Sequence, residues 1–239
     1  MTFTAVARCP RTGMLGVGIA TRAPAVGNRC PVVRPGYGAA SVQLIADPRQ
    51  TQLCGRLLDL GYSARKVLAE LEASDPHIGR RQIGIVDSYG NTAAFSGETR
   101  GSHSSHIEGK QYVTMGNGVV SAGVVKAMAR AMDESADEDL CDRLMAAVEA
   151  GGRAGGQAEG QSSAAILVFD TEPFAHLDLR VDLHPEPIGE LRRIYDWFKP
   201  LIPYFRERPY DPYIARDDHW RAARLAEPQP GKPRLGAAR

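Results

Sequence analysis

Cysteine is scarce in this chain of 239 residues, and its four copies lack the spacing of a metal site or a redox motif. None of them forms a C-x-x-C pair, and no group of Cys and His has zinc-finger spacing. We therefore expect free thiols, most of them buried, in a reducing compartment, and a protein that needs no cofactor. The four are Cys9, Cys30, Cys54 and Cys141.

An excess of charge of one sign is also absent, with 29 Lys and Arg against 28 Asp and Glu. Domains that bind nucleic acid usually show a basic excess, so the balance predicts no nucleic-acid partner. No stretch reaches the roughly 18 apolar residues needed to span a bilayer. Residues 1–8 lack the basic start and apolar run of a signal peptide. We expect a cytoplasmic protein with no membrane partner.

Apolar periodicity and turn residues predict strands that alternate with pairs of helices. Gly16 and Gly18 leave one face of the second strand thin enough for another layer to approach closely. Residues 97–109 are typical of a polar loop, and Val120, Val124 and Met128 share one helical stripe. Strands are predicted at 2–7, 14–21, 30–34, 39–45, 81–87, 92–95, 111–115, 163–169 and 176–184, and helices at 51–60, 64–73, 119–132, 138–150 and 188–201.

Hairpin-connected strands between helix pairs indicate an α+β domain with largely antiparallel sheets covered by helices. Two packed sheets between helical layers satisfy this order, and so do other α+β arrangements. We assign residues 1–206 to this domain and 207–239 to an irregular C-terminal tail or oligomerisation arm, because core residues become few there. Tyr210, Tyr213 and Trp220 favour an arm that holds a homo-oligomer, expected to be a dimer, while a disordered tail is the other interpretation.

Several short motifs, in order along the chain, carry a resemblance to one bacterial family, the domain-of-unknown-function 1028 family. The likeness extends from Thr2 to about Tyr204. The family is regarded as a branch of the N-terminal-nucleophile (Ntn) hydrolases, which implies a four-layer αββα sandwich with two mainly antiparallel sheets between helical layers. The motifs are TFTAVA at 2–7, LGVGIA at 15–20, PAVG at 24–27, RPGYGA at 34–39, RQI at 81–83, AAFSG at 93–97, GN at 116–117, AGG at 154–156, SAA at 163–165 and DLRVDLH at 178–184.

The resemblance implies that Thr2 is the nucleophile. Ntn hydrolases attack with the side chain of the first residue of the mature chain, and Thr2 becomes that residue once Met1 is removed. Aminopeptidases generally remove the initiator Met when a residue as small as Thr follows. An α-amine has an ordinary pKa near 7.7–8.0 and can accept and return a proton close to neutral pH. Without the resemblance, Thr2 is simply a good strand former.

Five further residues are candidates for the site. Asn117, between two glycines, is the candidate oxyanion donor, although a turn residue is the alternative interpretation. Arg22 follows the second strand and is expected to tune the amine or to bind a substrate carboxylate, and Arg34 to do similar work. Gln43, an amide in an apolar strand, and Ser163 are expected to line the substrate site.

Two features of the chain depart from the pattern of related hydrolases. The proteasome-like branch carries a lysine on an early strand, whereas the first lysine here is Lys66, in a predicted helix. Many family members have an acidic residue directly after the paired glycines and a Gln or His just before the serine. Gln157 and Ser162 occupy those places, which weakens a role for Ser163.

A metal site is the weaker alternative. His103 and His106 have ligand chemistry, with Asp182 and His184 as partners, but H-x-x-H in a loop is a weak signal, and we predict no metal. We expect an Ntn-type amidohydrolase that cleaves a small polar amide or related C–N compound. The rival hypothesis is a catalytically silent relative that binds a small ligand or serves as an oligomeric partner.

Overall fold

The computed structural model describes residues 1–99 and 102–225, and the chain divides into two units. The first unit runs from Met1 to Arg193 and contains both sheets, and the second begins at Ile194. The boundary placed at residue 206 from the sequence lies inside the second unit.

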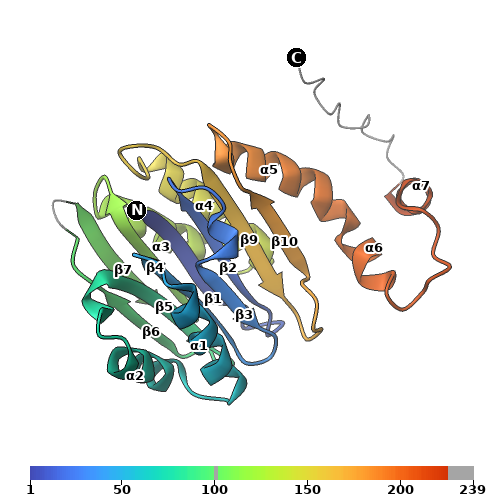
Figure 1. Cartoon of the computed structure of the whole chain (residues 1–239). Coiled ribbons are helices and arrows are strands. Elements are labelled where there is room, and N and C mark those ends of the chain that lie inside the picture. The colour runs from blue at the N-terminus through green and yellow to red at the C-terminus, as the bar shows by residue number, and fades with distance from the viewer. Residues whose placement is uncertain (100–101, 226–239) are drawn as a thin grey trace. The chain divides into compact units, whose positions relative to one another are not determined.

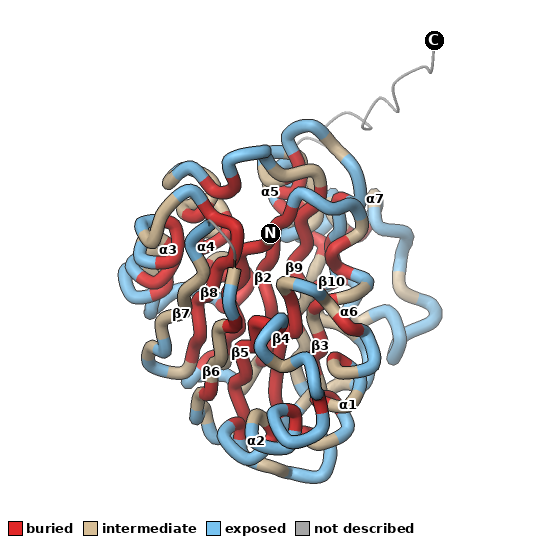
Figure 2. The backbone as a smooth tube through the Cα atoms, turned by 60° about the vertical axis from the view of Figure 1, so that its left-hand side comes forward, coloured by how far each residue is buried: buried red, intermediate tan, exposed pale blue. Residues whose placement is uncertain are grey.

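A six-stranded antiparallel sheet has the two N-terminal strands at its centre (Figure 1). Every residue of β2 and all but the last of β1 are buried, because both strands are covered on both faces. Figure 2 shows the same contrast between buried strands and exposed loops. In spatial order the strands are β10 (Leu177–Val181), β9 (Ser163–Phe169), β2 (Leu15–Thr21), β1 (Thr2–Arg8), β8 (Tyr112–Val119) and β7 (His103–Gly109).

A second antiparallel sheet has four strands and faces the first. Its order is β3 (Pro31–Arg34), β4 (Gly38–Leu44), β5 (Arg81–Asp87) and β6 (Thr92–Ser96). Helices α1 (Pro48–Asp59) and α2 (Ala64–Ser74) contact this sheet, and α3 (Gly123–Glu134) and α4 (Leu140–Arg153) contact the six-stranded one. The fold is thus mixed α+β, with two antiparallel sheets and helices packed on each.

Two helix starts follow from local capping chemistry. The Asp47 carboxylate accepts a hydrogen bond from the Arg49 backbone N–H at 3.0 Å, ahead of α1. The Ser63 hydroxyl accepts one from the Lys66 N–H at 3.4 Å, so Ser63 is the N-cap of α2. The remaining elements of the first unit are the 3₁₀ turns η1 (Val26–Asn28) and η2 (Ile78–Arg80) and the start of α5 (Pro187–Phe198).

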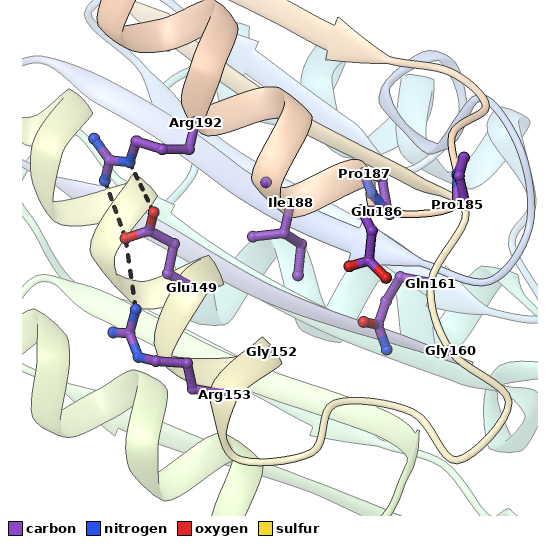
Figure 3. Close-up of a pocket in the computed structure, with 11 residues that line it drawn as sticks. Glu149, Gly152, Arg153, Gly160, Gln161, Pro185, Glu186, Pro187, Ile188 and Arg192 are labelled. Atoms are coloured by element: carbon purple, nitrogen blue, oxygen red, sulfur yellow. Dashed lines mark hydrogen bonds and ion pairs between the residues drawn. The ribbon is translucent and has the colours of Figure 1, made fainter.

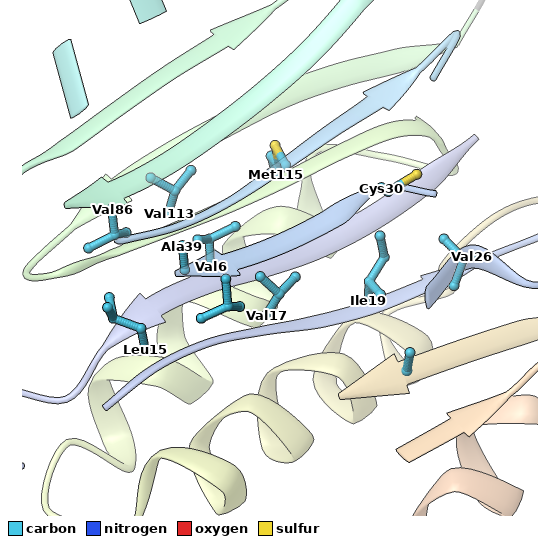
Figure 4. Packing of buried hydrophobic residues seen from close by; sticks show 12 residues of the cluster. Val6, Leu15, Val17, Ile19, Val26, Cys30, Ala39, Val86, Val113 and Met115 are labelled. Carbon is cyan, nitrogen blue, oxygen red and sulfur yellow. The ribbon is translucent and has the colours of Figure 1, made fainter. Parts of the chain in front are cut away.

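Aliphatic side chains fill the space between the two sheets (Figure 4). Each fully buried Val, Leu or Ile contributes about 1.5–3 kcal/mol through its removal from water. This layer therefore fixes the spacing of the sheets over most of their length, and the polar site lies beyond its end. Among its members are Val6, Leu15, Val17, Ile19, Val33, Val86, Val113 and Met115.

Strand β2 packs closely on α4 because two of its residues have no side chain. A Cβ added at Gly16 would lie 2.8 Å from Leu144 Cδ1, and one added at Gly18 would lie 3.0 Å from the Leu144 carbonyl oxygen. Both positions are too tight for a side chain, which confirms the sequence prediction of a close layer on this face.

The structure differs from the sequence prediction around β7 and β8. The prediction of a polar loop over 97–109 is wrong for residues 103–109, which form β7, an edge strand that needs no apolar alternation on its solvent side. Strand β8 continues to Val119, so α3 begins only at Gly123. Val120, predicted to share a helical stripe with Val124 and Met128, lies before α3 and is 43% exposed. Asn117 consequently lies inside a strand instead of after one.

The second unit is helical in its described part. It contains the end of α5, η3 (Lys199–Leu201), α6 (Ile202–Glu207) and α7 (Asp217–Leu225), the last within the segment predicted to be irregular. The Tyr204 and Trp220 ring centroids lie 5.5 Å apart, and Phe198 stacks on Phe205 at 5.2 Å. The dimer expected from the sequence stays a prediction. Over the described residues, no helix combines the length and apolar character that crossing a bilayer takes.

Candidate active site

A row of polar side chains crosses the six-stranded sheet at the end where β1 begins. Residues directly opposite each other on antiparallel strands point to the same face of a sheet. Strand register places five polar residues of five neighbouring strands in one such row. In spatial order they are Ser163, Thr21, Thr2, Asn117 and Ser104.

The row faces the four-stranded sheet. Side chains two and four residues apart on a strand share a face. Thr4 Oγ1 donates to Gln43 Oε1 of β4 at 2.6 Å, and Val6 packs in the layer between the sheets. Thr2 therefore points into the space between the sheets, beyond the apolar layer.

A cavity of about 500 Å³ lies beside the central part of this row. Thr2 forms part of its wall and is 5% exposed. The volume of the cavity falls within the roughly 300–1,000 Å³ typical of small-molecule sites. The predicted nucleophile thus lies at a space of ligand size instead of being enclosed by packed side chains. The lining residues are Met1, Thr2, Thr21, Arg22, Ala23, Pro24, Val26, Arg29, Cys30, Leu44, Ile45 and Ala46.

Met1 covers the middle of the row, around Thr2. The Thr21 hydroxyl donates to the Met1 carbonyl oxygen, and the Met1 side chain lies so close to Gly118 that a Cβ there would clash with it. Gly118 has a φ of 62°, which also favours glycine. Removal of Met1 would therefore uncover the backbone next to Asn117.

The chain's amine lies in an environment that favours its neutral form. Burial lowers the pKa of the Met1 amine, and the positive charge of Arg22 lowers it further, while Glu159 acts in the opposite direction. An amine used as a general base must be neutral, so this environment suits that role. The influence of Arg22 on the α-amine of Thr2, expected from the sequence, stays a prediction.

Arg22 and Arg29 give the cavity a cationic wall. Arg22 Nε lies 3.0 Å from Glu159 Oε2, with both side chains more than half exposed. The Arg29 guanidinium donates to the Pro24 carbonyl oxygen. Among the described residues that line the cavity there is no Asp or Glu.

Cys30 lines the same cavity but is not poised to act as a nucleophile. Burial raises the pKa of its thiol to about 11, against smaller opposing effects of Arg29 and the chain's amine. The thiolate is the reactive form of cysteine, so Cys30 is almost wholly unreactive at neutral pH.

Asn117 lies beside Thr2 but points into a buried polar network. Its side chain is fully buried, and its Nδ2 donates to Gln82 Oε1 at 2.9 Å. Its Oδ1 is buried with no hydrogen-bond partner among the described residues. Since Nδ2 carries two N–H groups, one further donor remains.

Gln82 of β5 is the centre of that network, and sequence reasoning missed it. Its Oε1 also accepts from Gln43 Nε2 at 2.8 Å, and its Nε2 lies 3.0 Å from the Gly116 carbonyl oxygen and 2.9 Å from Ser96 Oγ. Gln43 is fully buried with these partners, so its inward amide is satisfied, but it does not line the cavity. Two successive polar residues before an apolar run, at 81–82, were the available signal.

The other two predicted residues have structural roles. Ser163 Oγ donates to the Ala23 carbonyl at 2.7 Å and accepts from the Val26 N–H at 3.2 Å, so it holds the loop that walls the cavity. Arg34 instead lies against α1, where its Nε donates to Asp59 at 3.0 Å. The structure does not bring Arg34 to the Thr2 cavity.

The side chains considered as metal ligands are kept apart. His103 and His106 belong to β7, and Asp182 and His184 follow β10, and these are the two opposite edges of the sheet. His106 Nδ1 instead bonds Ser96 Oγ at 2.9 Å.

Leu44, in the cavity wall, has a backbone conformation that is costly for its residue type. Its φ is 79°, and Ala25, beside the opposite wall, has a φ of 55°. Such conformations cost about 1–3 kcal/mol each and persist only where neighbouring contacts hold them. Arg81 supplies one such contact by donating to the Ile45 carbonyl oxygen. The wall is therefore held in place, not merely a surface loop.

Arg81 is itself fixed by two carboxylates. Its guanidinium lies 2.8 Å from Asp75 and 3.5 Å from Asp47, and all three residues are nearly buried. Burial alone would raise the pKa of Asp75, but hydrogen bonds from Arg81 and the His77 N–H outweigh it, and the pKa lies below its ordinary value. Hydrogen bonds from Arg49 lower the pKa of Asp47 to about 2.

A second cavity, of about 420 Å³, offers less for catalysis (Figure 3). Glu149 lies between Arg192, which it accepts from at 2.7 and 3.0 Å, and Arg153 at 3.8 Å. Its described lining residues include no Ser, Thr, Cys or Lys that could serve as nucleophile. The cavity beside Thr2 is the better candidate.

Fold and site together define a mixed α+β protein whose first strand carries a threonine at the wall of a cavity between two sheets. A family model for DUF1028, described as a family of unknown function, matches residues 2–191, and the chain belongs to this family. No curated protein matches the chain.

Solved structures add a relative of the same fold. A crystal structure of a DUF1028 protein from Silicibacter pomeroyi is 27% identical, with a TM-score of 0.75, and the match covers 83% of this chain and 89% of that one. The ancestral beta-subunit Anbu from Yersinia bercovieri matches at 12% identity and a TM-score of 0.41, over 85% of this chain and 96% of that one. An Anbu Gly-1 mutant from Hyphomicrobium sp. strain MC1 matches at 12% identity and a TM-score of 0.42, over 87% of this chain and 99% of that one. Similarity at these two TM-scores supports no inference about the chain.

Proposed function

We propose that this protein is an Ntn-type amidohydrolase in which Thr2, exposed as the first residue by removal of Met1, cleaves the C–N bond of a small polar amide. The observation that carries the proposal is the position of Thr2, in the wall of a ligand-sized cavity with its hydroxyl 3.0 Å from that of Thr21. The order of helices, two facing sheets and helices is what a four-layer αββα sandwich requires.

The chemistry needs only groups that the processed chain would carry. Thr2 Oγ1 attacks the amide carbonyl carbon and its proton passes to the Thr2 α-amine. The C–N bond then breaks, the amine's proton moves to the leaving nitrogen, and an ester to Thr2 remains. A water molecule gives a proton to the same amine and attacks the ester. The Thr2 hydroxyl regains that proton as the carboxylic acid leaves.

Asn117 is the donor we assign to the developing oxyanion. It lies directly opposite Thr2 in the β1–β8 pair, and one Nδ2 N–H remains after the bond to Gln82. Departure of Met1 from its place against Gly118 would open the space through which a substrate oxygen reaches this donor. Loss of one such donor typically costs about 10²–10³ in kcat.

The test is ammonia release from a panel of small carboxamides by protein whose intact mass shows loss of Met1. We expect turnover by the wild type and by Thr2→Ser, which keeps a hydroxyl, and none by Thr2→Ala, which keeps only the amine. Ser and Ala are as small as Thr, so all three proteins should lose Met1. Equal turnover by Thr2→Ala would remove Thr2 as nucleophile.

One observation favours the rival function, a silent relative that binds a small ligand. The first lysine of the chain, Lys66, lies in α2 over the Tyr62 ring, and the described residues that line the Thr2 cavity include no lysine. Among these lining residues, the early-strand lysine of the proteasome-like branch therefore has no counterpart. Ligand binding by the wild type without turnover of any amide in the panel would support this function.

A further inference from the structure

The charge of the Thr2 cavity distinguishes it from the other two cavities described. The cavity at Glu149 balances two arginines with two carboxylates, and a third, near His77, contains both Arg80 and Glu98. The Thr2 cavity is lined by Arg22 and Arg29 and by no described acidic residue. A wall of this kind attracts an anion.

The segment that carries both arginines is held firmly from two sides. Ser163 bonds the backbone of Ala23 and Val26, and the Ala25 N–H donates to the Asp182 carbonyl oxygen at 2.8 Å. The guanidinium groups therefore project from an anchored backbone, which reduces the entropy lost when they bind a ligand.

Both guanidinium groups retain donors that the protein does not use in the contacts described. Arg22 engages Glu159 through Nε, and Arg29 engages one backbone carbonyl. Each guanidinium carries five N–H donors in a plane that matches a carboxylate. The remaining donors suit bidentate binding of a carboxylate at either arginine.

Glu159 is a carboxylate that the chain itself presents to this site. It lies outside the cavity lining, more than half exposed, on the loop before Ser163. Exposed ion pairs contribute little to stability, so a ligand carboxylate that reaches Arg22 can replace Glu159 at small cost. The internal pair then acts as a weak competitor of the ligand.

We propose that the site takes small amides that also bear a carboxylate, held by Arg22 and Arg29, and that Glu159 competes for Arg22 in the empty site. The apolar part of the wall, which includes Val26, Leu44 and Ile45, suits a short aliphatic chain between amide and carboxylate. The assignment of the substrate class rests on the proposed function. The preference of the cavity for an anion does not, because binding alone measures it.

The probes are succinamate, which has one carboxylate and one amide, and succinamide, its neutral counterpart. Binding is measured by calorimetry on Thr2→Ala protein, which cannot turn the probes over by the proposed mechanism. We expect succinamate to bind about tenfold or more tightly than succinamide, because charge-assisted hydrogen bonds are about twice as strong as neutral ones. Equal affinities, or no binding of succinamate at millimolar concentration, overturn the proposal.

Arginine variants in the same background locate the anion site. Arg22→Gln and Arg29→Gln should each weaken succinamate binding by about tenfold and leave succinamide unchanged, and Arg22→Lys should lie between. Arg65→Gln, at an exposed position on α2, is the matched control and should change neither affinity. Glu159→Gln should tighten succinamate binding by about two- to fivefold. A weaker complex with Glu159→Gln overturns the competitor role, and unchanged affinity with both arginine variants overturns the site.

The outcomes separate this inference from the catalytic one. If Thr2→Ala keeps full turnover, Thr2 is not the nucleophile. The charge preference of the cavity is still decided separately, by the affinities for succinamate and succinamide. If both probes bind alike but Thr2→Ala is inactive, the substrate class is wrong and the nucleophile is supported.

Discussion

Thr2 Oγ1 lies 3.0 Å from Thr21 Oγ1 across the β1–β2 pair, and Thr21 also donates to the Met1 carbonyl oxygen. A hydroxyl has a single proton to donate, so Thr21 accepts from Thr2 while Met1 is present. Removal of Met1 takes away that carbonyl. The Thr21 proton then becomes available to Thr2 Oγ1 or to the new α-amine, so loss of Met1 would change both the hydrogen bonding and the accessibility of the proposed nucleophile.

Replacement of Thr21 by valine keeps the shape of the side chain and removes only the hydroxyl. We expect kcat on a carboxamide substrate to fall by about 10²-fold, because Thr2 loses the partner that orients its hydroxyl. Thr21→Ser restores the hydroxyl and should restore most of the rate, while thermal unfolding checks that both variants are folded. Wild-type kcat in Thr21→Val would show that this hydrogen bond has no part in the reaction.

The pH dependence of kcat/KM should report the environment of the amine. The base must be neutral, so activity is lost as pH falls through the pKa of the α-amine of Thr2 in the free enzyme. Burial and Arg22 lower the pKa of the Met1 amine, and the Thr2 amine one residue on should feel the same influences. Arg22→Gln removes one of them, raises the pKa and should move the acid limb to higher pH.

Arg65→Gln is the control for this shift, since it removes an arginine from α2. Salt should move the wild-type limb in the same direction as Arg22→Gln, because ions screen the charge of Arg22. An acid limb that stays fixed, or moves to lower pH, in Arg22→Gln would show that Arg22 does not tune the base.

The buried Arg81 should matter for stability more than any exposed ion pair. Arg81→Met leaves Asp75 buried without its main partner. We expect the free energy of unfolding, measured by urea denaturation at neutral pH, to fall by about 3–5 kcal/mol. The double variant Asp75→Asn with Arg81→Met removes the unpaired charge and should recover part of the loss. A double variant as unstable as the sum of both single variants would contradict this account.

Asp75 and Asp47 also contribute to the loss of stability in acid. The pKa of Asp75 and Asp47 lies below the ordinary value of 3.8 in the folded chain, near 2 for Asp47. Their stabilisation is therefore present above about pH 4 and is lost as pH falls toward 2. In Arg81→Met, burial should instead raise the pKa of Asp75. Protonation of Asp75 then removes the unpaired buried charge that destabilises the variant. The difference in unfolding free energy between the two proteins should narrow as pH falls from neutral.

Much of the fold was predictable from the sequence because local pattern and packing agree. Strands at 81–87 and 163–169 were predicted to the residue. Gly16 and Gly18 predicted that another layer approaches β2 closely, and in the structure this layer is α4. Edge strand β7 was not predicted, because a strand with one side in solvent needs no alternation of apolar and polar residues. Val120 was misplaced because it continues the apolar run of a helix that in fact begins three residues later.

The candidate site was predictable residue by residue but not as an arrangement. Thr2, Asn117 and Ser163 were each singled out, yet their alignment with Thr21 depends on strand register across four strands, which no local pattern encodes. Gln82 was missed because the two polar residues at 81–82 do not by themselves show that the Gln82 side chain points into a buried network, which only its partners reveal. The direction of Arg34 toward α1 likewise depends on tertiary packing.

Covalent labelling with a carboxylate-bearing β-lactone tests the central assignment most directly. Ring opening by the Thr2 hydroxyl would leave an ester on the N-terminal peptide, sensitive to hydroxylamine, in protein that has lost Met1. We predict this adduct in the wild type, and its absence in Thr2→Ala and in protein whose N-terminus is extended so that Thr2 stays within a peptide bond. Equal labelling of all three proteins, or an adduct mapped to another residue, would contradict the account.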